Sequence, residues 1–330
     1  MKRTLQVTQE KWQLKKPFII ARGARNETHT ITVNLMETGY IGRGEAVSSP
    51  RYGENDQTVI ADIEAVRSKL ENGLTRQELQ HVLPAGSARN AIDNALWDLE
   101  AKLSGRDVGT LSGLGWPKKV MTVQTVSILP PEQMEKEAAL LKDFPIIKVK
   151  LNADQVKERI KAVHAGAPNS KLLVDANESW TIDILRDVAA HMADCGVVMI
   201  EQPLKAGDDD ALSGYNGPLP IFADESCHAR NDLPKLVGKY NGINIKLDKT
   251  GGLTEAIALM AEAKALGFDI MIGCMLGTSL GMAPALFLAP HASYVDVDAP
   301  ALLAHDRRDG LSVRNGSVSA LNKNLWGSPT

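Results

Sequence analysis

The sequence predicts a modified TIM barrel, a (β/α)7β-like arrangement of parallel strands and helices, preceded by an α+β capping domain. Two observations support this α/β fold class. From about residue 118 onward, eight short apolar runs alternate with amphipathic stretches that have helical spacing. Before that point, strand-like segments are followed by a series of helical ones, which is the order expected for a separate α+β unit. A length of 330 residues accommodates one large barrel together with a smaller domain.

Three strand-like segments near the start of the chain predict a small antiparallel sheet. The middle segment, residues 29–37, alternates polar and apolar side chains, and Thr38-Gly39 follows it as a turn. The other two segments span residues 5–9 and 40–47.

Two helices are expected to pack on this sheet. The first spans residues 56–70, and the second spans residues 88–103, with Ser87 as its N-cap and Gly105 as its C-terminal stop. Together these elements predict a capping domain over residues 1–117, which residues 311–330 are expected to complete by packing back onto it.

The barrel is expected over residues 118–310. Its strands should be the apolar runs at residues 120–126, 146–151, 171–175, 197–201, 220–224, 243–247, 269–273 and 293–298. Residues 254–266 illustrate the intervening helices, with apolar residues at helical spacing and Gly267 as the stop. In barrel enzymes the active site lies at the carboxyl ends of the strands, so residues at those ends are the candidates for function.

Composition narrows the class of protein. The net charge is −3 and no run of five or six like charges occurs, so the electrostatic footprint of a nucleic-acid-binding protein is missing. No stretch approaches the roughly 18 consecutive apolar residues that span a bilayer, and the sequence begins without an apolar signal core. Three widely spaced cysteines argue against a disulfide framework or a zinc cage. We expect a cytoplasmic protein with a small-molecule partner; the sequence leaves its oligomeric state, including a homo-oligomer, undecided.

Acidic residues end three consecutive barrel strands of the predicted fold. Asp175, Glu201 and Asp224 follow one another at intervals of 23 to 26 residues, so their side chains should meet at one end of the barrel. Their mutual repulsion would raise their pKa values and destabilise the fold unless a cation joined them. Three carboxylates with room for water suit Mg²⁺, a cation that prefers oxygen ligands. Ion pairing of each acid with a lysine or arginine at the rim is the alternative.

Lysines occur at the same end of the predicted barrel. Lys148 and Lys150 alternate with apolar residues on the second strand, and Lys246 lies near the end of the sixth. Two neighbouring lysines should depress each other's ammonium pKa and make a neutral amine available as a base. The second and sixth strands of an eight-stranded ring are opposite, so Lys150 and Lys246 should flank a substrate from two faces. That arrangement suits inversion of a stereocentre, whereas a solvated strand face is the alternative for these lysines.

Five motifs at these positions resemble those of the muconate-lactonizing branch of the enolase superfamily. They are Lys148-Val149-Lys150, Asp175-Ala176-Asn177, Glu201-Gln202-Pro203, Asp224-Glu225-Ser226 and Lys246-Leu247-Asp248-Lys249-Thr250-Gly251-Gly252. Their order is that of the family and the resemblance covers nearly the whole chain. It implies one Mg²⁺ bound by the three acids, with Lys150 and Lys246 as acid/base residues acting through an enediolate. It also implies that Lys148 neutralises carboxylate charge near the metal.

Asp296-Val297-Asp298 narrows the choice within that branch. Alternation puts both aspartates on one face of the last strand, and two further carboxylates near a metal site suggest a receptor for an ammonium group. The pattern resembles that of the dipeptide epimerases, where it binds the α-ammonium of the N-terminal residue. Capping of a helix, or pairing with Arg307 or Arg308, is the alternative.

A loop at residues 21–25, together with a second loop at residues 49–54, is expected to cover the barrel mouth. By similarity to Ala-Glu epimerases, Arg25 in the first loop would contact the side-chain carboxylate of a C-terminal glutamate. The alternative is a solvated arginine.

The resemblance therefore implies a Mg²⁺-dependent isomerase that inverts the α-carbon of the C-terminal residue of a dipeptide. L-Ala-D-Glu and L-Ala-L-Glu of murein peptide metabolism are the expected substrates, interconverted by two-base 1,1-proton transfer. Another reaction of the superfamily, such as cycloisomerisation or racemisation of an N-acyl amino acid, is the alternative. A Schiff-base aldolase would leave the three acids without a role, and a binding barrel without turnover would not need both bases and all the ligands.

Overall fold

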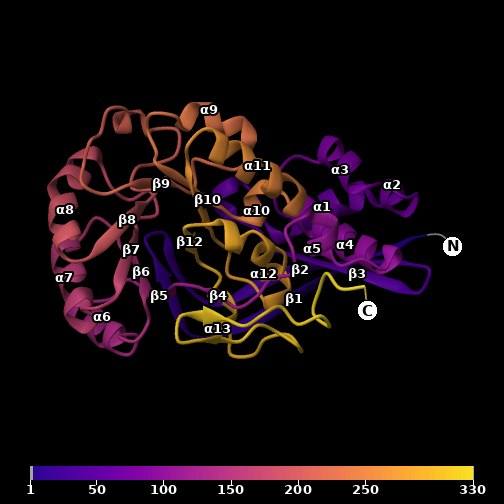
Figure 1. The fold of residues 1–330 in the computed structure, drawn as a ribbon, viewed down its shortest axis with the longest axis horizontal. Coiled ribbons are helices and arrows are strands. Elements are labelled where there is room, and N and C mark those ends of the chain that lie inside the picture. Colours follow the sequence, from indigo (N-terminus) through magenta and orange to yellow (C-terminus); the bar gives the residue numbers. More distant parts are fainter. Residues whose placement is uncertain (1–2, 330) are drawn as a thin grey trace.

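The strands of the protein form three sheets in the computed structural model, which describes residues 3–329. Met1, Lys2 and Thr330, at the outer limits of the expected capping domain, lie outside the described residues. A three-stranded antiparallel sheet comes first along the chain, and an eight-stranded parallel sheet follows it. Figure 1 shows the first sheet and its helices on the right and the curled parallel sheet on the left. The predicted fold, a barrel with an N-terminal capping domain, is confirmed.

The antiparallel sheet is longer than the sequence pattern predicts. Its strands are β1 (Thr4–Ile20), β2 (Gly23–Glu37) and β3 (Tyr40–Ala46). No side chain of residues 6–27 is buried, so no apolar alternation marks the outer half of the β1–β2 hairpin. The expected loop at residues 21–25 is therefore wrong: the hairpin turns at Ala21-Arg22, and Arg25 lies within β2 opposite Phe18.

Five α-helices lie between the first sheet and the barrel among the described residues. They are α1 (Asp56–Ala65), α2 (Arg67–Glu71), α3 (Arg76–Val82), α4 (Ser87–Ser104) and α5 (Val108–Ser112). The expected helix at residues 56–70 is interrupted at Val66, which separates α1 from α2.

The buried helix α4 fits tightly against β3. A Cβ at Gly42 or Gly44 would collide with the backbone carbonyl of Ala95 or Ala91, so these positions need glycine. Gly105 ends α4 in the left-handed conformation, as predicted.

The start of α4 differs from the prediction that Ser87 is its N-cap. The N-cap is Gly86, whose φ of 147° favours glycine. Ser87 lies in the first turn, and its hydroxyl donates hydrogen bonds to the carbonyl of Val47 at 2.8 Å and to Glu54 at 2.6 Å. The helix start is thereby fixed to the segment that follows β3.

Each of the eight barrel strands overlaps one of the eight predicted runs, and the strands lie in chain order around the sheet. They are β5 (Gln124–Val126), β6 (Ile146–Lys150), β7 (Lys171–Asp175), β8 (Val197–Glu201), β9 (Ile221–Ala223), β10 (Gly242–Ile245), β11 (Asp269–Ile272) and β12 (Tyr294–Val295). The edges of the sheet meet where the amide of Val123 donates to the carbonyl of Val295 at 2.9 Å. The ring therefore closes, and the carboxyl ends of its strands face one another.

The helical layer around the barrel is less regular than eight repeats would give. Four longer helices are α6 (Pro131–Ala139), α7 (Val156–Gly166), α8 (Ile182–Asp194) and α11 (Leu253–Ala265). The remaining connections contain short turns: η2 (Asp210–Leu212), η3 (Arg230–Asp232), α9 (Leu233–Leu236), α10 (Leu247–Thr250), α12 (Ser279–Met282), η4 (Pro284–Phe287), η5 (Ala289–His291) and α13 (Ala299–Leu302). Between β8 and β9, the described chain has only the short turn η2 in place of a full helix.

The C-terminal segment contacts both parts of the molecule. β13 (Val313–Arg314) and β14 (Ser317–Val318) form the third sheet with β4 (Val120–Met121), so the first half of the expected run 120–126 lies outside the barrel ring. Farther on, the indole of Trp326 donates to the carbonyls of Arg43 at 2.8 Å and Asn94 at 3.2 Å. In Figure 1 the last described residues of this yellow segment lie beside the capping domain.

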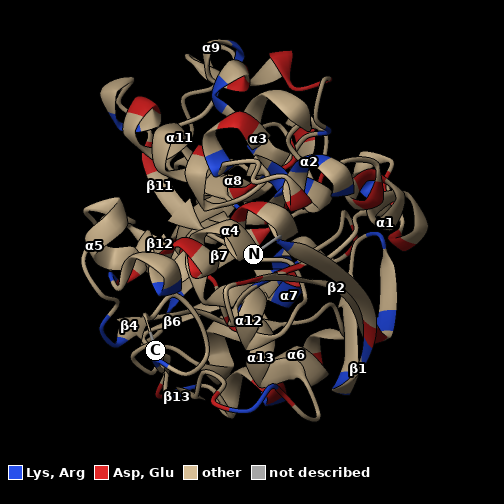
Figure 2. Ribbon diagram, turned by 90° about the vertical axis from the view of Figure 1, so that its right-hand side faces the viewer, with Lys and Arg blue, Asp and Glu red and all other residues tan. Residues whose placement is uncertain are grey.

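The surface has mixed charge. Figure 2 shows Lys and Arg interspersed with Asp and Glu over α1, α2 and α3. Within residues 3–329, no helix combines the length and the apolar character that crossing a membrane requires.

Candidate active site

The structure brings the predicted site residues together at the carboxyl ends of the barrel strands. A cavity of about 460 Å³ lies there, between the barrel and the capping domain. Seven of the predicted residues line it: Arg25, Lys148, Lys150, Asp224, Lys246, Asp296 and Asp298. The other two, Asp175 and Glu201, are fully buried beside Asp224.

The three acids form a compact oxygen cluster. One carboxylate oxygen from each of Asp175, Glu201 and Asp224 lies within 4.8 Å of the other two. Oε1 of Glu201 accepts a hydrogen bond from Nδ2 of the Asn244 side chain at 2.8 Å. Oε2 of Glu201 receives no hydrogen bond of favourable geometry from the described residues, although the Lys148 ammonium lies 2.7 Å away. Buried carboxylate oxygens at this spacing fit a small hard cation such as Mg²⁺.

Each lysine of the site is paired with an acid of the cluster. Nζ of Lys150 lies 2.5 Å from Asp175, and Nζ of Lys246 lies 2.6 Å from Asp224. Lys148 bridges Glu201 at 2.7 Å and Asp296 at 2.7 Å. Lys150 on β6 and Lys246 after β10 are four strands apart in the ring, so they reach the cavity from opposite sides, as the spacing predicts.

These ion pairs shift the protonation equilibria of the lysines. Burial by itself would lower the pKa of Lys148 and Lys246, but the surrounding carboxylates outweigh it and raise both pKa values. The expectation that neighbouring lysines depress each other's pKa is therefore wrong for Lys148. Each of these two ammonium groups lies against carboxylates from other strand ends, and the spacing of residues along the sequence does not reveal these contacts.

The acids respond unequally to the same surroundings. Burial opposes ionisation of Asp175 and Asp224, yet the adjacent lysines lower the pKa of both. Burial, with the negative charge of Asp175, raises the pKa of Glu201. A cation that satisfied all three oxygens would favour the ionised form of each acid.

Asp296 and Asp298 both line the cavity, and Asp296 is paired with Lys148. Oδ2 of Asp298 accepts a hydrogen bond from the amide of Thr125 at 2.9 Å, and Oδ2 of Asp296 accepts one from Lys148 at 2.7 Å. Burial, followed by the charge of Asp296, raises the pKa of Asp298 to about 7. Two buried carboxylates facing one cavity create a negative potential that a bound ammonium would neutralise.

The structural alternatives for these two aspartates do not hold. Arg307 is instead bound to Glu45 at 2.6 Å and to Glu10 at 2.5 Å, and the Arg308 side chain is exposed. Asp298 precedes the short helix α13 but its side chain makes no capping hydrogen bond.

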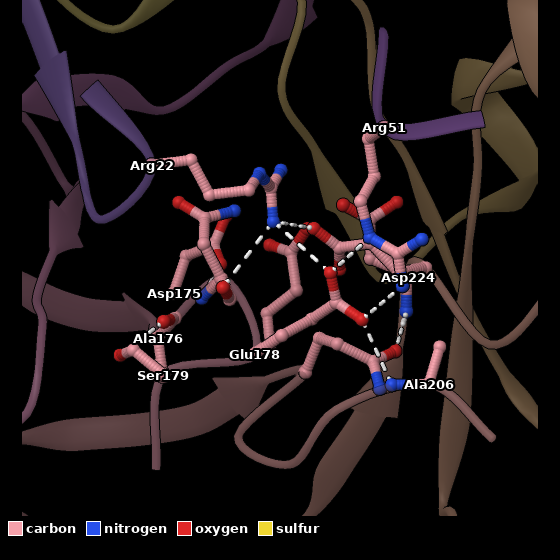
Figure 3. Close-up of polar contacts among 12 residues, drawn as sticks. Arg22, Arg51, Asp175, Ala176, Glu178, Ser179, Ala206 and Asp224 are labelled. Atoms are coloured by element: carbon pink, nitrogen blue, oxygen red, sulfur yellow. Dashed lines mark hydrogen bonds and ion pairs between the residues drawn. The ribbon is translucent and has the colours of Figure 1, made fainter. Parts of the chain in front are cut away.

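Two segments of the capping domain cover the cavity. One is the tip of the β1–β2 hairpin, which carries Arg22, and the other is η1 (Pro50–Tyr52), which carries Arg51. Figure 3 shows both arginines converging on Glu178, which follows β7. Arg22 also lies 2.7 Å from Glu225.

The arginine that the sequence did single out has a different environment. Arg25 lines the cavity, is exposed on its other side and makes no ion pair within residues 3–329.

Lys249 is a fully buried residue of the site whose role the sequence did not reveal, although it lies in a recognised motif. Its ammonium donates to Oδ1 of Asp224 at 2.7 Å and to the carbonyls of Asp224 at 2.5 Å and Asn244 at 2.9 Å. Lys249 thus fixes the orientation of Asp224 just beyond the short strand β9. The signal that could have found it is its place three residues after Lys246, in the turn that follows the same strand.

The fold and the site define a two-domain barrel with an acidic cluster and opposed lysines at the strand ends. Comparison with protein families agrees with this class. The family described as "Enolase C-terminal domain-like" matches residues 133–324, and "Mandelate racemase / muconate lactonizing enzyme, N-terminal domain" matches residues 2–113. The chain therefore belongs to the mandelate racemase/muconate lactonizing group of the enolase superfamily.

Individual relatives cover nearly the full length of the chain. An L-Ala-D/L-Glu epimerase of Escherichia coli (strain K12) is 49% identical over 318 residues, covering 96% of this chain and 99% of the relative. An N-acetyl-D-glutamate racemase of a Pseudoalteromonas species is 42% identical over 301 residues, covering 90% of this chain and 95% of the relative.

Solved structures of similar proteins share the fold. An enolase family member from Agrobacterium tumefaciens with homology to dipeptide epimerases, with bound sodium and L-Ala-L-Glu, has a TM-score of 0.96 at 44% identity, covering 98% of this chain and 100% of that chain. A dipeptide epimerase from Enterococcus faecalis V583, complexed with Mg and L-Leu-L-Tyr, has a TM-score of 0.91 at 28% identity, covering 99% of each chain.

Proposed function

We propose that the protein is a dipeptide epimerase that inverts the α-carbon of the C-terminal residue and interconverts L-Ala-L-Glu and L-Ala-D-Glu. The observation that carries this proposal is the pair Lys150 and Lys246, which reach one cavity from opposite sides of a carboxylate cluster. The 49% identity to an L-Ala-D/L-Glu epimerase supports the same activity.

Asp175, Glu201 and Asp224 would hold one Mg²⁺, since their buried oxygens form the only all-carboxylate cluster of this kind in the described chain. When bound, the ion would neutralise the substrate's terminal carboxylate and stabilise the negative charge that develops as the α-proton leaves. The ammonium of Lys148, 2.7 Å from Glu201, adds positive charge at the same place.

The two opposed lysines perform the proton transfers. Epimerisation requires one of them as the neutral amine and the other as the ammonium. Nζ of the neutral lysine accepts the α-proton from one face of the substrate. The protonated lysine then donates a proton to the opposite face, which inverts the stereocentre. Lys150 and Lys246 exchange these roles when the reaction runs in the other direction.

The two ends of the substrate are recognised by different charges. Asp296 and Asp298 receive the α-ammonium of the N-terminal residue at one end of the cavity. Of the three arginines that line the cavity, Arg22 and Arg51 are already paired with acids, whereas Arg25 has no ion pair among the described residues. Arg25 is therefore the group that binds the side-chain carboxylate of a C-terminal glutamate.

Racemisation of an N-acyl amino acid is the second candidate, because an N-acetyl-D-glutamate racemase is 42% identical to this chain. An acyl group carries no positive charge, so it would leave Asp296 and Asp298 without a cation in a buried site. These aspartates favour the dipeptide.

Steady-state kinetics on four compounds test the proposal. L-Ala-L-Glu should be epimerised efficiently, whereas N-acetyl-L-Ala-L-Glu and L-Glu should react poorly because neither places an ammonium at Asp298. L-Ala-L-Leu should have a higher KM, because it leaves Arg25 without a carboxylate. Equal kcat/KM for the free and acetylated dipeptides would overturn the role of the two aspartates.

The proposed function assigns a role to each part of the chain. Residues 118–310 would form the catalytic barrel, and residues 1–117, completed by 311–330, would form the cap that covers its mouth. Contacts of Trp326 with Arg43 and Asn94 support the assignment of the C-terminal segment to the cap. The proposed substrates are dipeptides of murein. We therefore infer that the enzyme acts in the recycling of murein peptides, in the cytoplasm. The enzyme requires neither nucleic acid nor a membrane as a partner.

A further inference from the structure

Glu178 is the acceptor on which four hydrogen bonds from three other segments converge. Its Oε2 accepts from Nε of Arg51 at 2.5 Å and from Nη1 of Arg22 at 3.3 Å. Its Oε1 accepts from Nη2 of Arg51 at 2.6 Å and from the amide of Ala206 at 2.8 Å. The Glu178 side chain is only 7% exposed, so this carboxylate is largely removed from water. Figure 3 shows the arrangement.

The two arginines belong to the two separate segments that cover the cavity. Arg22 is at the tip of the β1–β2 hairpin, and Arg51 is in η1, some thirty residues farther along the chain. Each lines the cavity. No hydrogen bond joins Arg22 directly to Arg51 among the contacts of the described residues. Glu178 is therefore a side chain to which both covers are hydrogen-bonded.

The backbone at Asn177 and Glu178 directs the Glu178 side chain toward the capping domain. Asn177 has φ of 43° and Glu178 has φ of 67°, so two consecutive residues other than glycine adopt the left-handed conformation. The amide of Asn177 donates to Oδ1 of Asp175 at 2.9 Å, and its carbonyl accepts from Arg22 at 3.2 Å. This strained turn thus connects the end of β7 to the cover of the cavity.

We propose that Glu178 is a positioning residue that holds the hairpin tip and η1 closed over the cavity as one unit. Arg22 is also held by Glu225 at 2.7 Å, but because both arginines share the Glu178 carboxylate, loss of either contact leaves the other segment less firmly held. Glu178 does not line the cavity and is assigned no proton transfer. Its effect on turnover is exerted through Arg22 and Arg51.

Hydrogen exchange followed by mass spectrometry tests this proposal without a substrate. The amides at the hairpin tip belong to the pairs Phe18–Arg25, Ile19–Ala24 and Ile20–Gly23. Glu178→Gln keeps the size of the side chain but removes its charge. In this variant, amide hydrogen exchange at residues 18–25 should accelerate roughly tenfold. Arg51→Gln should accelerate exchange in the same hairpin tip, although no hydrogen bond or ion pair joins Arg51 to the tip among the described residues.

The decisive comparison is the double variant. If the two segments are joined through Glu178, Arg51→Gln in the Glu178→Gln background should add little to exchange at the hairpin tip. Lys16→Gln is the matched control, because it breaks an exposed ion pair of the same hairpin with Glu137, 2.8 Å long, and should leave the tip unchanged. Unchanged exchange at residues 18–25 in Arg51→Gln, with the fold intact by circular dichroism, would overturn the proposal.

Kinetics give a second readout, which rests on the proposed function. A cover that is closed for a smaller fraction of the time lowers the apparent affinity by that fraction, while saturating substrate restores closure. Glu178→Gln should therefore raise KM for L-Ala-L-Glu about tenfold and change kcat by less than about twofold. Loss of kcat with unchanged KM would contradict the positioning role. If the wild-type enzyme did not turn over the dipeptide, the proposed function would fail, and hydrogen exchange alone would still decide the role of Glu178.

Discussion

Asp298→Asn should weaken binding of the dipeptide and stabilise the fold at the same time. The asparagine carbonyl can still accept the hydrogen bond that the amide of Thr125 donates to Asp298 at 2.9 Å, so the substitution removes charge and preserves shape. A hydrogen bond to a charged group contributes about 1.5–3 kcal/mol. Losing the charged interaction between Asp298 and the substrate ammonium should therefore lower kcat/KM for L-Ala-L-Glu by roughly 10- to 150-fold.

The gain in stability follows from the pKa of the same carboxyl group. Burial and the charge of Asp296 raise the pKa of Asp298 from 3.8 to about 7. The folded protein therefore binds one more proton than the unfolded chain between these two pKa values, and its free energy of unfolding falls as pH rises through that window. Above the folded pKa the ionised carboxylate destabilises the fold by on the order of a few kcal/mol. Asparagine cannot ionise, so the variant avoids this loss.

Two measurements check the prediction for Asp298. Urea unfolding should show the variant more stable than the wild type at pH 8, with the difference disappearing near pH 4. For the wild type, kcat/KM should rise with pH through about 7, because the ammonium needs the ionised carboxylate, and the variant should lack this rise. A variant that is less stable at pH 8, or that keeps wild-type kcat/KM, would refute the reasoning.

Three further predictions concern the centre of the site. Exhaustive treatment with EDTA should abolish turnover and added Mg²⁺ should restore it; full activity of the chelated protein would contradict a metal site at the three acids. Lys150→Ala and Lys246→Ala should each stop epimerisation, while the remaining lysine can still exchange the α-proton of one enantiomer with D₂O, as followed by NMR. Near wild-type epimerisation by both variants would contradict the two-base scheme. Lys249→Met should lower the free energy of unfolding by about 1.5–3 kcal/mol in urea titrations, because it removes one of the two ammonium groups that hold Asp224 and leaves the carbonyl of Asn244 without the hydrogen bond from Lys249. A loss below about 1 kcal/mol would show that the site relaxes around the missing ammonium.

The catalytic centre could be predicted from the sequence because a barrel repeats its strand–helix unit at a nearly constant interval. That regularity places Asp175, Glu201 and Asp224 in phase at strand ends, where a charge after an apolar run is conspicuous. Most of the eight strands were predictable for the same reason, since they are short apolar runs with buried residues on both faces.

The cover of the site could not be predicted in this way. The outer half of the β1–β2 hairpin has no buried face, so no periodic pattern distinguishes it from a loop. The contacts of Glu178 with Arg22 and Arg51 depend on how the capping domain docks on the barrel, which local sequence does not determine. Likewise, the pKa of Lys148 is raised by carboxylates from three other strand ends. The residues next to Lys148 in the sequence give no indication of these contacts.

The most direct test of the proposed activity is proton NMR of L-Ala-L-Glu incubated with the Mg²⁺-loaded enzyme in D₂O. Only the α-carbon of the C-terminal residue lies between Lys150 and Lys246 in the proposed binding mode. The α-proton signal of glutamate should therefore disappear as L-Ala-D-Glu accumulates, and the α-proton of alanine should remain. Retention of the glutamate α-proton, or its loss from alanine instead, would contradict the account.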